Sequence, residues 1–127
     1  MSAPYTIYLK DLPLGTTELE KADPPMGVVA GIIHFSDPSY GFDFLRAYCE
    51  ENLVAHSVLD EGEKCLAISP IEQLVVRNHL GQEIPAAGNA IEGMEHEGFE
   101  LTLLGVPYPF YGEEFPHHVQ AYEQAYE

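Results

Sequence analysis

Side chains that can hold a metal ion gather near the end of the chain. Glu113, Glu114, His117 and His118 lie within six residues. Carboxylates and imidazoles four positions apart can share a helix face and ligate Zn²⁺ or a similar ion. Pro116 interrupts any helix between the two pairs, and adjacent histidines point about 100° apart on a helix. A metal-binding protein or metal-dependent enzyme is therefore one alternative, beside the simpler interpretation of a surface helix start with two histidines; no cofactor is predicted.

Aromatic residues surround the same glutamates in segment 106–116, where Tyr108, Phe110 and Tyr111 precede Glu113 and Glu114. Aromatic side chains are enriched at the centres of protein interfaces. One interpretation is a recognition loop whose rings stack on Arg or Lys of a partner while its carboxylates pair with them. The alternative is a rigid loop that seals the sheet edge or covers the core.

Evidence for catalysis is weak. His34 lies in an apolar run, where a buried neutral histidine can act as a general base, although a hydrogen-bonded core histidine is the more common case. The chain lacks G-x-S-x-G, a Walker loop and G-x-G-x-x-G. Cys49 falls on an apolar helix stripe and is expected to be an inert core thiol. The sequence thus favours a binding protein over an enzyme.

The charge of the chain is strongly one-sided. Five basic residues face 21 acidic ones, giving a formal charge of −16, and no Lys or Arg follows Asn78. Solubility needs a magnitude of only about 2–8 in a small domain, and such a field speeds encounter with a cationic surface. We therefore expect a basic protein partner. The residues predicted to bind it are Glu92, Glu95, Glu97, Glu100, Tyr108, Phe110, Tyr111, Glu113 and Glu114.

Composition also excludes several classes of function. Nucleic-acid binding is not expected, because phosphate contacts need Lys and Arg. The longest apolar stretch, 27–33, is too short to span a bilayer, and residues 1–4 lack the basic and apolar regions of a signal peptide. Cys49 and Cys65 form no C-x-x-C motif, which is typical of a reduced pair. Together these features predict a cytoplasmic protein that does not bind membranes.

Hydrophobic patterns predict the elements that position these residues. Residues 5–10 alternate like a half-buried strand and could form a hairpin with 16–21 through a turn at 11–15. Residues 27–35 are apolar on both faces, as in a central strand covered on both sides. Asp37, Pro38 and Ser39 resemble a helix start, and an apolar stripe predicts a helix over 39–52.

Further elements are expected in the second half. Residues 64–69 and 73–78 read as short strands, three prolines exclude regular structure over 106–116, and a short helix is predicted over 116–126. The clearest pattern is a hairpin over 89–106 with the loop 96–98 and a left-handed Gly98, pairing Glu95 with Phe99. This register puts Glu92 and Glu100 together on an exposed face, opposite the apolar residues.

The elements add up to an α+β protein. We predict a single domain over residues 1–127, with a largely antiparallel sheet of five to seven strands, one main helix and a short C-terminal helix. The preferred function is a small inhibitor or immunity-type protein that neutralises a basic partner, such as a toxic nuclease, by occupying its phosphate-binding groove. A homodimeric assembly subunit, with Tyr5, Tyr8 and the aromatic loop at its interface, is a further alternative.

Overall fold

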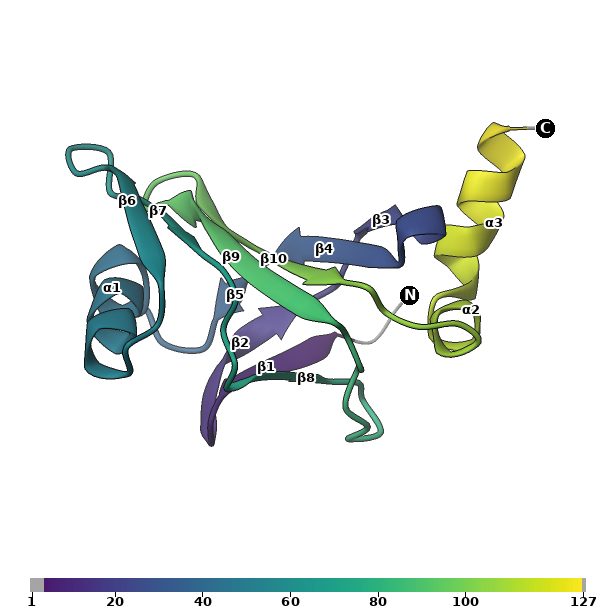
Figure 1. Ribbon diagram of the computed structural model, residues 1–127, viewed down its shortest axis with the longest axis horizontal. Helices are drawn as coiled ribbons and strands as arrows, with labels where there is room; N and C mark the ends of the chain where they lie inside the picture. The colour runs from purple at the N-terminus through teal and green to yellow at the C-terminus, as the bar shows by residue number, and fades with distance from the viewer. Residues whose placement is uncertain (1–3, 127) are drawn as a thin grey trace.

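The computed structural model describes residues 4–126; Met1 to Ala3, where the signal-peptide pattern was sought, and Glu127 lie outside the described residues. It confirms the α+β class, with two antiparallel sheets over a common core (Figure 1). The six-stranded sheet has the order β3-β4-β10-β9-β7-β6, and a second sheet, which the sequence did not suggest, has the order β5-β2-β1-β8. None of the helices within residues 4–126 is long and apolar enough to cross a membrane.

The smaller sheet begins with a tight hairpin. Its strands are β1 (Tyr5–Leu9), β2 (Leu12–Thr17), β5 (His34–Phe35) and β8 (Leu74–Arg77). The buried face of β1 is the predicted one, but the turn is shorter than expected, because Leu9 already pairs with Leu12. Lys10 makes this possible by adopting a left-handed conformation with φ 56°.

The larger sheet contains the predicted hairpin. Its strands are β3 (Lys21–Asp23), β4 (Val28–Ile32), β6 (His56–Asp60), β7 (Cys65–Ile68), β9 (Gly88–Met94) and β10 (Gly98–Leu104). The predicted faces are correct, and Gly98 is left-handed. The loop is one residue earlier than expected, so Phe99 pairs with Gly93 and not with Glu95. A shift of two in pairing leaves every side chain on the same face.

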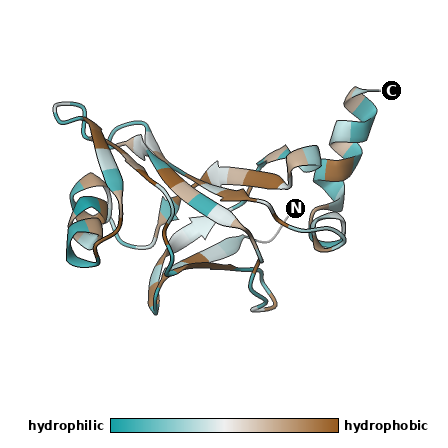
Figure 2. Cartoon of the chain, in the orientation of Figure 1, coloured by the Kyte–Doolittle hydropathy of each residue, from teal (hydrophilic) through white to brown (hydrophobic). Residues whose placement is uncertain are grey.

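The expected central strand over 27–35 is divided between the sheets. The chain leaves the larger sheet after β4 and enters the smaller one as β5, with Ile33 still bonded to the carbonyl of Phe99. β4 is apolar along most of its length (Figure 2), but only its inner face is fully covered. His34 is exposed and pairs with Thr16. The prediction of a buried, potentially catalytic His34 is therefore wrong, because the chain changes sheets just before it.

In the part of the chain that the structure describes, three α-helices and one 3-10 turn complete the fold. α1 (Phe42–Glu51) buries its apolar stripe of Phe42, Leu45 and Cys49, and α3 (Pro116–Ala125) matches the predicted C-terminal helix. α2 (Phe110–Glu114) lies in a segment where no regular structure was expected, since one helical turn fits between Pro109 and Pro116. The turn η1 spans Pro24–Met26. In Figure 1, α1 lies at one end of the molecule and α2 and α3 at the other.

Candidate binding surface

The aromatic loop covers the core instead of forming a protruding surface. Tyr111 and Phe115 are fully buried, and the Tyr111 hydroxyl donates a hydrogen bond of 2.8 Å to the carbonyl of Val28. Phe110 packs partly against the core. Tyr108 is about half exposed, with its hydroxyl 3.0 Å from the carbonyl of Pro24. The prediction that Tyr111 contacts a partner is therefore wrong, because its side chain has no exposed surface.

Glu114 is likewise a structural residue. Its carboxylate accepts hydrogen bonds from the hydroxyl of Tyr5 at 2.8 Å and from the amide Nδ2 of Asn78 at 3.1 Å. These bonds tie α2 to the smaller sheet. Burial, together with this carboxylate, raises the pKa of Tyr5. Tyr5 is itself buried and so cannot form the proposed homodimer face, whereas Glu113 is exposed.

The histidine pair does not assemble a metal site with the glutamates. His118 is buried, and its Nε2 lies 2.7 Å from the carbonyl of Leu19, where it must carry a proton to donate. The ring of the exposed His117 packs against it at an interplanar angle of 43°, with ring centroids 4.1 Å apart. Partial desolvation and the neighbouring His118 ring lower the pKa of His117. Across residues 4–126, no three His, Cys, Asp or Glu side chains come close enough together to hold an ion.

Of the hairpin glutamates, Glu95 has a role that the sequence did not suggest. The N-terminus of α1 is preceded by Gly41, which has no side chain to cap it. Glu95 supplies the missing acceptor, with its Oε1 3.2 Å from the backbone nitrogen of Phe42. Asp37, expected to cap the helix, instead bonds the backbone and hydroxyl of Ser39. The carboxylate of Glu95 is thus engaged within the fold, near the positive end of the helix dipole.

Glu92 and Glu100 lie directly opposite each other in the middle of the larger sheet. The pairing of five adjacent strands places them in one row, with the order Ser57, Ala67, Glu92, Glu100, Ile32. This row lies on the outer face, the side of the sheet turned away from the core. Like charges directly opposite each other destabilise a sheet. Lys21 contacts Glu100, and this contact raises the pKa of Lys21.

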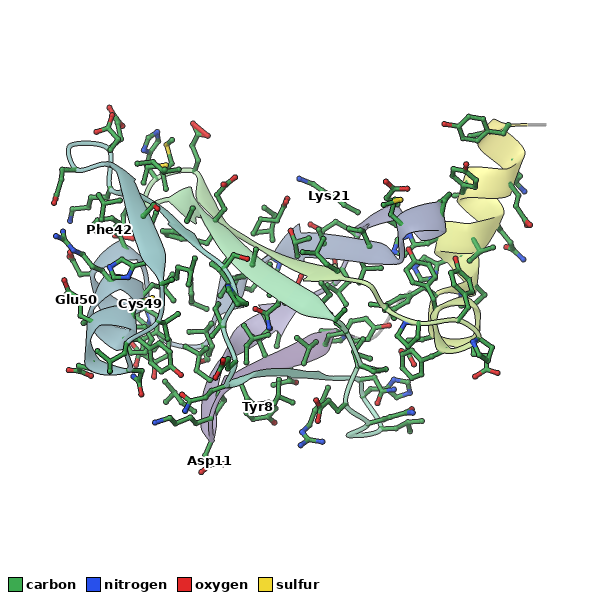
Figure 3. All side chains as sticks on the ribbon, viewed as in Figure 1. Tyr8, Asp11, Lys21, Phe42, Cys49 and Glu50 are labelled. Carbon is green, nitrogen blue, oxygen red and sulfur yellow. The ribbon has the colours of Figure 1, made fainter. Side chains whose placement is uncertain are left out.

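The outer face is uncovered and slightly hollowed. No helix lies over its centre in Figure 1, where it faces upward between the β6–β7 hairpin and α3, and Lys21 projects from this side in Figure 3. Two hollows of about 290 and 380 Å³ adjoin along it, and Glu92 lines both. We call this region the trough. Outward-facing side chains that line it are Ser57, Leu59, Cys65, Ala67, Ala90, Glu92, Met94, Glu100 and Ile32.

The negative charge is not neutralised within the fold. Within residues 4–126, Lys and Arg side chains form ion pairs only with Glu100, Glu50, Glu61 and Asp43. Surface pairs of this kind are individually weak. The remaining acidic residues are spread over several surfaces, so the predicted partner-binding residues do not form one patch. Glu92, Glu97 and Glu100 belong to the outer face or its rim, whereas Glu113 lies on α2 at the far end.

The small residues of the trough were missed by the sequence reasoning. Along β7, Cys65 and Ala67 alternate with the buried residues Leu66 and Ile68. This alternation identifies an open face only when β7 is known to pair with β9, and no local sequence pattern predicts that pairing. No protein-family model matches the chain, and comparisons with curated proteins and with solved structures find no match either.

Proposed function

We propose that this chain is a binding protein that captures a basic protein partner, with the outer face of the larger sheet as its contact surface. The observation that carries the proposal is the position of Glu92. It is an exposed carboxylate in the middle of a floor of small and apolar side chains, and it faces a second carboxylate across the strand pair. Lys21 already pairs with Glu100, whereas Glu92 has no Lys or Arg partner among the described residues, so a cationic side chain from a partner would supply the charge that Glu92 lacks.

The overall charge supports the same partner class. A formal charge of −16 accelerates association with a basic protein, and this acceleration decreases as the salt concentration increases. A basic partner that handles nucleic acid presents a cationic groove for phosphate, which an acidic surface can occupy. We therefore propose an inhibitor or immunity-type role, in which this protein competes with the phosphates of the partner's substrate.

The experiment is a pull-down from lysate of the native host with four baits. One bait is wild type, one carries Glu92→Gln and Glu97→Gln, and a matched control carries Asp11→Asn and Glu51→Gln. Both double variants lose two negative charges, but Asp11 lies on the side opposite the trough in Figure 3 and Glu51 ends α1. The fourth bait is an unrelated acidic protein of similar size, which reports on nonspecific ion exchange.

The proposal expects one basic protein that is retained at about 50 mM salt, is lost by about 500 mM, and does not bind the unrelated acidic bait. The trough variant should retain much less of it than the matched control. The proposal fails if no basic protein is retained at low salt. It also fails if the two double variants retain equal amounts, because net charge alone would then explain the capture.

A further inference from the structure

Resting on the proposed function, we propose that the segment of the partner that occupies the trough is a basic amphipathic α-helix. The helix would lie across the strands with an apolar stripe on the floor of the trough and a Lys or Arg side chain on Glu92. The inference concerns the shape and chemistry of the bound segment and depends on features of the outer face that charge alone does not explain.

The floor allows close approach by another element. Exposed faces of antiparallel sheets normally carry polar or β-branched side chains. Here Ala67 and Ala90 flank Glu92, and neither side chain extends beyond Cβ. Larger apolar residues, Ile32 and Met94, are only partly buried at one side of the trough. Small residues at the centre with apolar residues beside them suit a convex, cylindrical ligand.

The dimensions match a short helix. The row from Ser57 to Ile32 crosses five strands. Neighbouring strands are about 4.8 Å apart, so the row is about 20 Å long. An α-helix of about 13 residues has that length.

Other occupants fit less well. Strand addition at β3 is obstructed by α3 and η1, which pack beside that edge. The opposite edge strand, β6, has a bulge between Val58 and Asp60 that disrupts regular pairing. A second copy of this chain would place its own charge of −16 against the same carboxylates. A cationic segment is complementary to Glu92 and Glu100, and of these two only Glu100 forms an ion pair with a Lys or Arg among the described residues, namely Lys21.

The test uses two synthetic peptides of about 18 residues with the same composition of Leu, Ala, Lys and Arg, enough for about five helical turns. One is arranged as an amphipathic helix and the other is scrambled to abolish the apolar stripe. Fluorescence anisotropy measures binding of each peptide to the wild type and to two separate variants, Ala90→Tyr and Glu92→Gln. The control variant, Ala47→Tyr, adds the same bulk on the exposed side of α1.

Cys65 offers a second readout that is independent of affinity. It lines the trough and is partly exposed, whereas Cys49 is buried in the core and serves as an internal control. A helix seated in the trough should slow the reaction of Cys65 with a thiol reagent. The expected result is at least tenfold tighter binding of the amphipathic peptide, at least tenfold weaker binding to Ala90→Tyr and Glu92→Gln, and no change with Ala47→Tyr.

Tyrosine is favourable in strands, so the Ala90→Tyr variant should keep the melting temperature of the wild type. If its melting temperature falls, the Ala67→Tyr variant is used in its place. The inference is overturned if both peptides bind equally, if neither binds, or if Cys65 stays equally reactive when the peptide is bound. If the pull-down retains a basic host protein but any of these results is found, the proposal of a helical partner segment is rejected and the proposed function stands.

Discussion

Two tyrosines of the aromatic segment provide a direct test of which residues support the fold. Tyr111 and Tyr108 both donate a hydrogen bond to a backbone carbonyl near β4, at 2.8 and 3.0 Å, and their rings stack with centroids 5.2 Å apart. Tyr111 is fully buried, whereas Tyr108 is 53% exposed. Replacing each with Phe removes one hydroxyl and little else. The contrast therefore compares the loss of a hydroxyl from a fully buried side chain with its loss from a half-exposed one.

The two substitutions should differ in magnitude. With Tyr111→Phe, the carbonyl of Val28 loses a buried donor, a change of about 1–3 kcal/mol in the free energy of unfolding. With Tyr108→Phe, the carbonyl of Pro24 keeps its bond from the backbone N–H of Gly27, and the hydroxyl that is removed belongs to a half-exposed side chain, so we expect a loss of at most about 0.5 kcal/mol. Urea unfolding followed by circular dichroism measures both, and an unchanged m-value confirms that the comparison is valid.

The same variant alters stability at alkaline pH. Burial raises the pKa of Tyr111 to about 12, so the folded state holds its proton more tightly than the unfolded chain, whose tyrosines ionise near 10. Stability is therefore fully present below about pH 10 and is lost as the pH rises toward 12. Tyr111→Phe should lose less stability over this range than wild type. Equal effects of the two Phe variants at neutral pH would refute the assignment of Tyr111 to the core.

Three further predictions concern strain and thiols. Leu53 is 94% exposed with φ 56°, so Leu53→Gly should stabilise the fold by about 0.5–1 kcal/mol in urea unfolding, whereas Leu59→Gly, within β6, should destabilise it. Cys65 should react with a thiol reagent in the native protein and Cys49 only after denaturation; rapid modification of both would contradict the packing of α1. Burial raises the pKa of Cys49 to about 11, so Cys49→Ala should flatten the loss of stability between about pH 9 and 11.

Local patterns predicted much of the fold. The β9–β10 hairpin was found because Gly98 and the alternation of Phe99, Leu101 and Leu103 are all contained within one short segment. The main helix was found for the same reason, although its start was placed three residues early. The Asp37 side chain accepts hydrogen bonds from Ser39 instead of capping the helix. The sequence alone does not distinguish these two roles of an Asp residue.

Features that depend on distant segments were not predictable. A continuous apolar run over 27–35 gave no sign that the chain changes sheets at Ile33, because both sheets bury residues of the same kind against one core. The cap on α1 comes from Glu95, more than fifty residues away. Similarly, the burial of Tyr111 is not predictable locally, because a Pro-rich, aromatic segment has the composition of an interface loop as well as that of a loop that covers the core.

The uncovered sheet face and the surplus negative charge account for each other. An open sheet face with apolar side chains is a hazard, because copies of the protein can associate through it. On this protein, two opposed carboxylates at the centre of the face and a charge of −16 on the whole chain oppose the association of identical copies through it. The same arrangement attracts any segment that is apolar on one side and basic at its middle. Under the proposed function, the same charge would disfavour a second copy of this chain on the face and favour a cationic partner.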